Sequence, residues 1–267
     1  MKLVTVIHGT GPVILGQPHS GTFVPDHIWA NLNDTGRQLL DTDWHVPTLY
    51  GGLLDDVTVV RANFSRYVID ANRDPQGTSL YPGQNSTELV PITTFDDMPI
   101  WKDPLSEADQ SMRLDTFHRV YHRALQCEIE RVKAAHGFAV LYDCHSIRSE
   151  IPHLFNNSLP DLNIGDNGGT TCSPLITAVI ERVCKRQTGY SHVVNGRFKG
   201  GWTTRHYGRP GEGVHAVQME LAQRLYLQSE EPPFTYDEQK AADLRRVLSD
   251  ILEEIQTTIQ TSLVTEE

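Results

Sequence analysis

Phe138-Ala139-Val140-Leu141-Tyr142 is a strongly apolar run that continues directly into Asp143-Cys144-His145-Ser146. A short, continuous apolar run is typical of a strand that is buried on both faces in the middle of a sheet. In open α/β sheets, functional residues gather at the carboxyl ends of the strands. The run therefore predicts a central strand, and its polar continuation predicts a functional site at the end of that strand.

Further strands and helices are expected on both sides of this run. Apolar and β-branched runs predict strands over Val13–Gly16, Val57–Val60, Tyr67–Ile69, Ser191–Val194 and Val214–Leu221. Helical spacing and capping residues predict a helix that Thr35 caps and Pro47 limits, and others over 106–137, 174–186 and 237–259. Gly-rich and Pro-rich segments predict loops over 74–104, 163–169 and 195–213. Since strands alternate with helices and no linker divides the chain, we expect a single α/β domain over residues 1–267, with a mixed central β-sheet flanked by helices.

The composition disfavours several classes of protein. The 267 residues carry 34 Asp and Glu against 23 Lys and Arg, a formal net charge of −11, whereas a nucleic-acid-binding protein needs a basic face. The longest apolar runs are far shorter than the ~20 residues of a membrane-spanning helix. The start of the sequence also lacks the pattern of a signal peptide. The four cysteines show no C-x-x-C spacing, so we expect neither a zinc ribbon nor disulfides, and a reducing cytoplasmic location.

Polar side chains follow four of the expected strands. They are His19, Asn72 with Arg73, Asp143 with His145, and Glu220. Two further acidic residues, Asp41 and Asp43, lie near the helix expected from Thr35. Two histidines and a carboxylate form a typical ligand set of a catalytic zinc site. Because the two histidines lie far apart in sequence and no compact motif joins them, structural roles for them stay open.

The other strand-end residues have chemistry of their own. A guanidinium grips a carboxylate with two parallel hydrogen bonds and an adjacent amide adds donors, so Asn72 and Arg73 are candidates for binding a substrate carboxylate. The alternative is a turn over 70–75 that holds internal salt bridges. Glu220 lies on an apolar strand, where a lone glutamate is rarely buried without a partner. Beside a metal ion, it is a candidate general base.

Motifs of other enzyme classes are weak or missing. The sequence contains no Gly-x-Ser-x-Gly, Walker A or Rossmann fingerprint, which disfavours serine hydrolases and nucleotide-binding proteins. His118 and His122 lie four residues apart on an expected helix, a spacing that can bind a metal ion. No third ligand is evident there, so packing is the favoured role. His206 and His215 lie near glycines, and we assign no chemistry to them.

Short segments spread over residues 14–226 together resemble the N-formylglutamate deformylase (N-formylglutamate amidohydrolase) family. The matching segments, in family order, are Pro18–Gly21, Leu40–Asp43, Ser65–Arg73, Asp143–Ile147, Asn195–Gly201 and Gln218–Leu221. Each segment is unspecific alone, and the ordered set carries the resemblance. The family is distantly similar to zinc carboxypeptidases and aminoacylases, which implies a zinc-exopeptidase-like (phosphorylase/hydrolase-like) fold.

The resemblance implies a metal site and a set of roles around it. His19, Asp43 and His145 would be the ligands of Zn²⁺ or of another divalent ion such as Co²⁺, Mn²⁺ or Fe²⁺, with Asp41 as the alternative to Asp43. Glu220 would correspond to the catalytic glutamate, and Asn72 with Arg73 to the pair that holds a substrate carboxylate. Asp143 and Asp41 would support the ligands through hydrogen bonds.

The implied reaction is hydrolysis of N-formyl-L-glutamate to L-glutamate and formate, the last step of one route of histidine degradation. A metal-activated water would attack, with Glu220 as general base and then general acid. The second carboxylate of this substrate needs another cation, for which Arg205, in the loop that begins at Gly200 and Gly201, is the first choice. Arg66 and Arg148 follow, and either could instead stabilise the oxyanion of the transition state.

Two alternative functions stay open at this point. One is a zinc amidohydrolase or carboxypeptidase that acts on another N-acyl acidic amino acid. The other is a non-catalytic protein that binds acidic metabolites. Because the net charge of −11 opposes an acidic small molecule, capture of such a partner must depend on local positive charge. Nothing in the sequence fixes the oligomeric state or the native metal.

Overall fold

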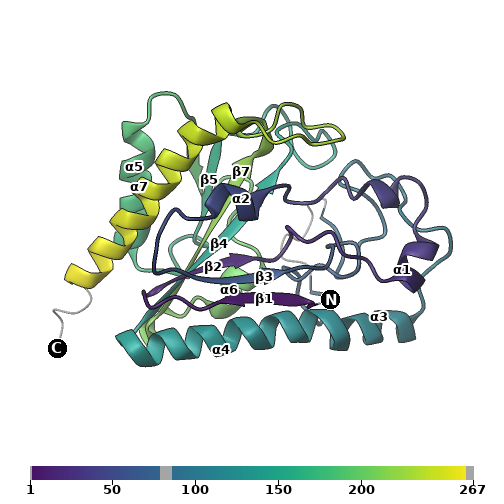
Figure 1. The fold of residues 1–267 in the computed structure, drawn as a ribbon, viewed down its shortest axis with the longest axis horizontal. Helices are drawn as coiled ribbons and strands as arrows, with labels where there is room; N and C mark the ends of the chain where they lie inside the picture. Colours follow the sequence, from purple (N-terminus) through teal and green to yellow (C-terminus); the bar gives the residue numbers. More distant parts are fainter. Residues whose placement is uncertain (1, 79–85, 263–267) are drawn as a thin grey trace.

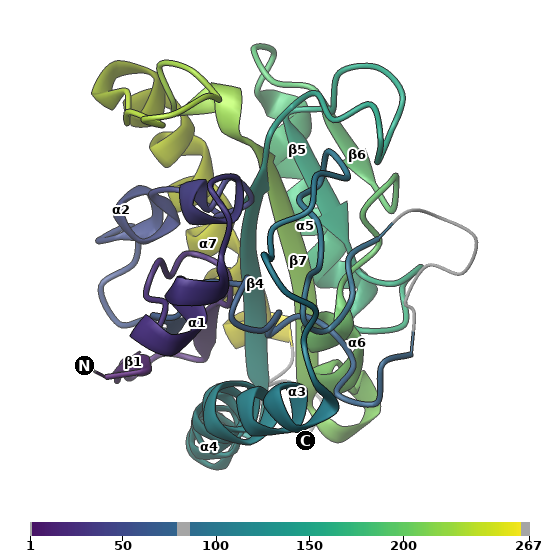
Figure 2. The ribbon, with the colours of Figure 1, turned by 90° about the vertical axis from the view of Figure 1, so that its right-hand side faces the viewer.

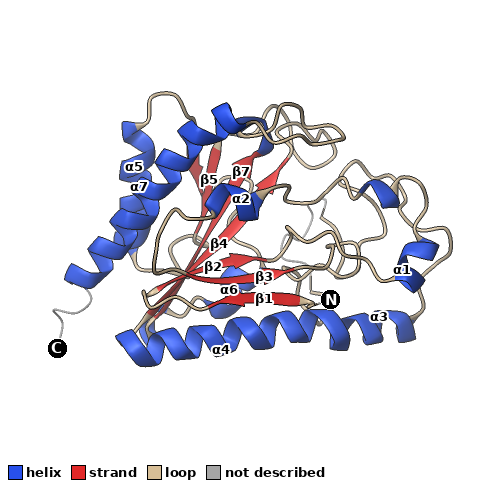
Figure 3. Ribbon diagram, viewed as in Figure 1, coloured by secondary structure: helices blue, strands red, loops and turns tan. Residues whose placement is uncertain are grey.

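Seven strands form one mixed sheet in the order β1-β3-β2-β4-β7-β5-β6, in a computed structural model that describes residues 2–78 and 86–262 (Figure 1, Figure 3). The strands are β1 Val4–Ile7, β2 Val13–Gln17, β3 Thr58–Ala62, β4 Ala139–Ile147, β5 Leu162–Gly165, β6 His192–Val194 and β7 Val214–Ala222. Strands β2, β3, β4 and β7 are parallel, whereas β1 and β5 pair antiparallel with β3 and β7. The expected mixed central sheet is thus confirmed, while β1 and β5 were not predicted.

The predicted central strand lies in the middle of the sheet. β4 pairs with β2 on one side and β7 on the other, and all nine of its residues are buried (Figure 2). The strand is longer than its apolar run, so Asp143 and His145 lie within the strand and not after it. Successive side chains in a strand point to opposite faces. Val140, Tyr142 and Cys144 therefore pack in one core, and Asp143 and His145 point to the other face.

Helices cover both faces of the sheet. One face carries α2 (Val46–Tyr50), α5 (Pro174–Arg186) and α7 (Glu238–Ser262), of which α5 and α7 lie side by side (Figure 1). The other carries α1 (Asp26–Asn31), α3 (Glu107–Arg113), α4 (Arg119–His136) and α6 (Trp202–Tyr207). Short 3₁₀ turns span Gly36–Gln38, Pro210–Glu212 and Gln223–Leu225. The two layers of helices give two separate apolar cores.

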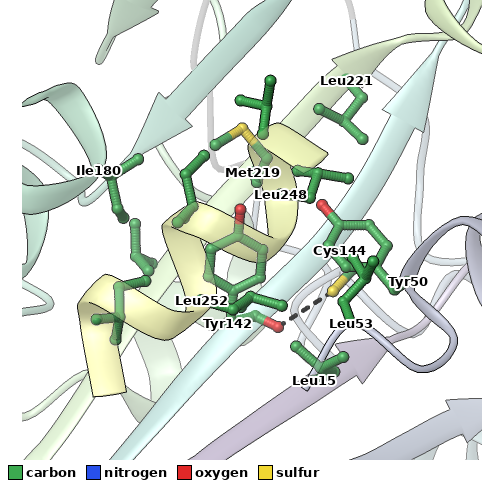
Figure 4. Close-up of a cluster of buried hydrophobic side chains, with 14 of the residues drawn as sticks. Leu15, Tyr50, Leu53, Tyr142, Cys144, Ile180, Met219, Leu221, Leu248 and Leu252 are labelled. Atoms are coloured by element: carbon green, nitrogen blue, oxygen red, sulfur yellow. Dashed lines mark hydrogen bonds between the residues drawn. The ribbon is translucent and has the colours of Figure 1, made fainter. Parts of the chain in front are cut away.

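The first core lies between the sheet and the pair α5 and α7 (Figure 4). Tyr142 and Met219 from the sheet meet Leu248 and Leu252 of α7, and all four side chains are fully buried. The second core lies between the sheet and α4, where Leu141 of β4 joins the buried face of that helix. Apolar residues recur at helical spacing along α4 and α7, which is why each helix buries one face only.

The long helix before β4 begins and ends as its sequence predicts. The Ser106 hydroxyl accepts a hydrogen bond from the Asp109 N–H at 3.1 Å, and Gly137 closes the helix with a φ of +82°. The helix is interrupted by one π-helical turn, Leu114–His118, between α3 and α4. This turn was not predicted, because an extra residue in a helical repeat leaves little trace in a single sequence.

Three local predictions were wrong. Tyr67–Ile69 forms a buried turn in which the Val68 N–H donates to the Ser65 carbonyl at 2.9 Å, because these apolar residues enter the second core without pairing with a strand. The helix expected from Thr35 is a 3₁₀ turn that ends at Leu39 in the left-handed region. Pro47 does not limit that helix but lies in the first turn of α2, where a proline costs no hydrogen bond.

The loop predictions were wrong in part, and two other expectations agree with the structure. The segment 195–213 contains α6 and a 3₁₀ turn, and the loop expected from 163 begins inside β5. The four cysteines are free thiols, as expected. Over the described residues, no helix combines the length and apolar character needed to cross a membrane.

Truncating Leu248 in the first core tests this packing. The side chain is fully buried, whereas Leu175 on α5 is 49% exposed and serves as the matched control. We expect Leu248→Ala to lower the free energy of unfolding by about 2–5 kcal/mol, because it leaves a cavity. Leu175→Ala should change it by less than about 1 kcal/mol. Urea unfolding followed by circular dichroism measures both, and equal effects would contradict this description of the core.

Candidate active site

The candidate site lies at the carboxyl edge of the parallel strands. His19 lies two residues beyond the end of β2, and His145 and Glu220 lie near the ends of β4 and β7. His145 is the direct cross-strand neighbour of Glu220, as Asp143 is of Gln218. Because side chains alternate along a strand, these four residues share the face opposite the first core. The sheet register alone therefore brings an imidazole next to a carboxyl group.

His19, Asp43 and His145 form a group that could hold a metal ion. One ligand atom from each lies within 4.8 Å of the others, and all three side chains are buried. The Asp43 Oδ2 atom lies 3.7 Å from His19 Nδ1 and 3.2 Å from His145 Nδ1. Two ligand atoms of a tetrahedral zinc ion with bonds of ~2.0–2.1 Å lie about 3.4 Å apart. The donor types and their spacing therefore fit a zinc-like ion.

Two further carboxylates fix the orientation of these imidazoles. Asp70 Oδ1 lies 2.6 Å from His19 Nε2, and Asp143 Oδ2 lies 3.2 Å from His145 Nε2. A carboxylate on the outer ring nitrogen selects the tautomer that leaves the other nitrogen as a donor to a metal. Both rings thus direct Nδ1 toward Asp43. Each candidate histidine ligand is therefore supported by a carboxylate of its own, His19 by Asp70 and His145 by Asp143.

Negative charge accumulates in this part of the protein. Five buried carboxyl groups gather here, those of Asp41, Asp43, Asp70, Asp143 and Glu220. The arginines among them are Arg66, whose Nη2 donates to Asp70 at 2.7 Å, the half-buried Arg73, whose Nη1 lies 3.7 Å from Asp70, and Arg148, whose Nη2 lies 3.7 Å from Asp41. More acids than arginines in one buried cluster favour the binding of an additional cation.

The pKa shifts follow from this charge distribution. Burial alone would raise the pKa of Asp70, but His19, Arg73 and Arg66 hold it well below its usual range. Burial and Arg66 lower the pKa of His19. Burial would also lower the pKa of His145, but Asp143 and Asp43 raise it well above its usual value. Burial raises the pKa of Glu220 to about 8, although the charge of His145 opposes this. Glu220 is therefore a carboxyl group that can both hold and release a proton near neutral pH.

Glu220 is held in place by a chain of two hydrogen bonds. Gln218 Nε2 donates to Glu220 Oε2 at 3.0 Å, and Gln218 Oε1 accepts from the Gly201 N–H at 2.7 Å. Gly201 is required there, because an added Cβ would lie 2.2 Å from the Asn72 Nδ2 atom. The loop before α6 is therefore packed against both Glu220 and the Asn72 segment.

A pocket of about 570 Å³, counted with its open mouth, gives access to this site. Its polar wall contains the three candidate ligands with Glu220, Gln218, Asn72 and three arginines, Arg66, Arg73 and Arg197. Its apolar wall contains Phe95, Ile147, Leu154 and Phe198. A small molecule with anionic groups and a short aliphatic chain would match this lining.

Asn72 and Arg73 occupy a tight turn beside the candidate ligands. The Asn72 N–H donates to Asp70 Oδ1 at 2.8 Å, and the Asn72 side chain lies 3.2 Å from His145 Nε2. Arg73 donates from Nε to the Thr87 carbonyl at 2.9 Å. The turn over 70–75 and the carboxylate-binding role were alternatives in the sequence, and the structure combines a turn with a position in the pocket wall.

Some predicted residues lie outside the pocket lining. Arg205 donates from Nε to the Gly200 carbonyl at 2.9 Å, and neither residue lines the pocket. Arg148 pairs with Asp96 at 2.5 Å and lies 3.7 Å from Asp41. Asp41 accepts from the Tyr67 hydroxyl at 2.7 Å and the Phe95 N–H at 2.9 Å, so the structure brings Asp43, and not Asp41, to the two imidazoles.

Three residues of the site were not predicted from the sequence, although signals for them exist. Asp70 follows the apolar run Tyr67–Ile69 just as Asp143 follows its own run. Gln218 lies two residues before Glu220, which places it on the same face of β7. Arg197 lies within the segment Asn195–Gly201 but received no role. In each case the residue can be singled out in the sequence, but the residue that it contacts in the fold is distant in sequence.

Comparisons with known proteins identify the family to which this chain belongs. The family model described as N-formylglutamate amidohydrolase matches residues 11–227. The N-formylglutamate deformylase of Pseudomonas putida is 43% identical over 255 residues, covering 94% of this chain and 95% of that protein. The enzyme of the same name from Pseudomonas aeruginosa is 44% identical over 257 residues, covering 95% and 96%.

A solved structure has the same fold. The crystal structure of N-formylglutamate amidohydrolase from Ralstonia eutropha JMP134 superposes with a TM-score of 0.80 at 27% sequence identity. The match covers 96% of this chain and 98% of that one. The expected likeness to zinc carboxypeptidases stays a prediction.

Removing the Asp70 carboxylate tests its support of His19. We expect Asp70→Asn to weaken binding of Zn²⁺ about 10- to 100-fold, because the tautomer and orientation of His19 are no longer fixed. Competition with a chromophoric chelator measures the affinity. Glu128→Gln is the matched control, since Glu128 also bonds a histidine, His8 at 3.1 Å, on another part of the molecule. Unchanged zinc affinity in the Asp70 variant would refute this role.

Proposed function

Since the chain belongs to the N-formylglutamate amidohydrolase family, we propose that it hydrolyses N-formyl-L-glutamate to L-glutamate and formate in a metal-dependent reaction. The relatives' names support the substrate. The observation that carries the metal-dependent reaction is the convergence of His19, Asp43 and His145 beside the buried Glu220. Together these groups provide a cation site and a proton-transfer group on one face of the sheet.

His19, Asp43 and His145 would hold the ion, and zinc is the first candidate because its preferred ligands are of these types. A divalent ion bound there supplies Lewis acidity toward a carbonyl oxygen and a water molecule. Arg66 lines the pocket with Nη1 3.8 Å from Asp43 Oδ1. From this position its positive charge stabilises the negative charge that develops on the formyl oxygen during attack.

Glu220 moves the proton. Its carboxylate takes a proton from the attacking water, and its carboxylic acid later delivers this proton to the leaving amine nitrogen. Because Gln218 donates to Oε2, Oε1 is the oxygen assigned to proton transfer. The raised pKa of Glu220, about 8, makes both protonation states accessible near neutral pH.

Two arginines would hold the two carboxylates of the substrate. Arg73, with Asn72 beside it, takes one carboxylate from the wall nearest the candidate ligands. For the other we assign Arg197 in place of Arg205, because Arg197 lines the pocket and Arg205 does not. Arg197 is held by a hydrogen bond from Nε to the Leu154 carbonyl at 3.0 Å. The apolar residues of the pocket lining would accommodate the methylene groups of the substrate.

The activity and the role of Glu220 can be tested together. Purified, zinc-loaded protein should release formate from N-formyl-L-glutamate faster than from N-formyl-L-aspartate, and should act poorly on N-acetyl-L-glutamate and on a dipeptide. Glu220→Gln should retain the metal but lose about 10²–10⁴-fold in kcat, because it cannot accept a proton. Near-normal turnover by a metal-loaded variant would disprove the general-base role, and absence of formate release by the wild type would disprove the proposed reaction.

The carboxylate assignments predict different losses for different substrates. We expect Arg197→Ala to raise the KM for N-formyl-L-glutamate about 10- to 100-fold, because a charge-assisted hydrogen bond is lost. The same change should leave the KM for N-formyl-L-glutamine almost unaffected, because its side chain is an uncharged amide and we assign Arg197 to the side-chain carboxylate and Arg73 to the α-carboxylate. Arg73→Ala should raise both KM values. Arg205→Ala is the control, and a substrate-selective loss in that variant and not in Arg197→Ala would reverse the assignment.

A further inference from the structure

Two histidines of the long helix contact the backbone on either side of Asn72. His118, the last residue of the π-helical turn, lies with Nε2 3.0 Å from the Arg73 carbonyl oxygen. His122, one helical turn later, lies with Nε2 2.7 Å from the Ala71 carbonyl oxygen. A carbonyl oxygen can only accept, so both imidazoles donate to this segment from Nε2. The spacing of four residues, which suggested a metal-binding pair, instead spans one three-residue segment.

Both imidazoles are themselves held in place. They are almost fully buried, with 2% and 8% of their surface exposed. His122 Nδ1 lies 3.0 Å from the Tyr207 hydroxyl of α6. The Trp202 ring packs against both histidines, with centroid distances of 5.5 Å to His118 and 4.7 Å to His122. The two donors therefore belong to a packed contact between the long helix and α6.

The same contact fixes the Asn72 side chain from the other direction. The Thr203 N–H of α6 donates to Asn72 Oδ1 at 2.8 Å. Gly201 closes on the Asn72 amide so tightly that no side chain would fit at position 201. The segment Ala71–Arg73 thus has its two outer carbonyls bound by the long helix and its central side chain bound by α6.

We propose that His118 and His122 are positioning residues, which set the conformation of the Asn72–Arg73 segment and so the orientation of the carboxylate-binding Arg73. This inference rests on the proposed function, because it assumes that Arg73 binds a substrate carboxylate. The π-helical turn contributes to this positioning, since it ends at His118 and sets the rotation of the residues of α4 about the helix axis relative to those of α3. Such turns occur frequently at functional sites.

The test replaces each histidine by Phe, which keeps an aromatic ring beside Trp202 but removes the donor, and by Gln, which restores an N–H donor. We expect His118→Phe and His122→Phe each to raise the KM for N-formyl-L-glutamate about tenfold, the effect of one lost hydrogen bond. The kcat and the bound zinc should stay close to those of the wild type. The Gln variants should recover most of the lost affinity, which calorimetric titration with L-glutamate measures independently.

A control variant and a double-mutant cycle separate positioning from an unspecific effect of removing a histidine donor from the helix. His136 on α4 also directs Nε2 to a carbonyl oxygen, that of Thr10 at 2.8 Å, far from the pocket residues in the sheet. His136→Phe should leave the KM unchanged. If His118 acts through Arg73, the effect of His118→Phe on KM should disappear in an Arg73→Ala background.

The outcomes are distinguishable. A raised KM in Arg73→Ala with an unchanged KM in both Phe variants overturns the positioning role and leaves the proposed function intact. An unchanged KM in Arg73→Ala overturns the carboxylate anchor and the positioning role with it. Additive effects in the double variant, or an equal rise in His136→Phe, show that the histidines act by a different route and overturn the inference.

Discussion

The burial of five carboxyl groups at one edge of the sheet is the constraint on which the site depends. Asp41, Asp43, Asp70, Asp143 and Glu220 are each less than a tenth exposed. Charges of one sign are costly to bury together unless each has a partner. Arg66 pairs with Asp70 and Asp43, and the Nε2 atoms of the two imidazoles lie against Asp70 and Asp143. The excess of carboxyl groups over arginines is what makes the cluster suited to a cation.

The same constraint explains why the supporting structure is so extensively hydrogen-bonded. Each carboxylate that approaches the ligands is tied to a separate element. Asp70 belongs to the turn after β3, and Asp143 accepts from the Thr204 hydroxyl of α6 at 3.1 Å. The Asp41 carboxylate accepts a hydrogen bond from the backbone N–H of Phe95, whose side chain lines the apolar wall of the pocket. One hydrogen bond therefore connects the carboxyl cluster to the apolar wall. The Arg66 guanidinium also lies over the Phe95 ring, 4.7 Å from its centroid.

The central strand and its two neighbours were predictable because their signals are local. The run from Phe138 to Tyr142 identifies a buried strand, and the polar residues after it follow from strand-end chemistry. Asp43 could not be distinguished from Asp41 by its neighbours in the sequence. Only the fold shows which of the two carboxylates lies next to the imidazoles. Tyr67–Ile69 has the composition of a strand, yet its burial comes from the second core and not from pairing. Arg197 lies in the loop before α6 and Arg205 within α6, and which of the two lines the pocket depends on contacts distant in sequence.

The alternation of faces along β4 has a consequence for how this protein can change. Val140, Tyr142 and Cys144 fill the first core and the alternate residues Asp143 and His145 serve the site, with no intervening loop between Val140 and His145. An insertion or deletion of one residue there would send Cys144 toward His19 and Asp43 and His145 into the apolar core, and so remove stability and chemistry in one event. Substitutions at single positions can be tolerated in this strand, whereas changes of length must be confined to the loops. A change in the length of β4 therefore affects its packing in the first core and its contribution to the site together.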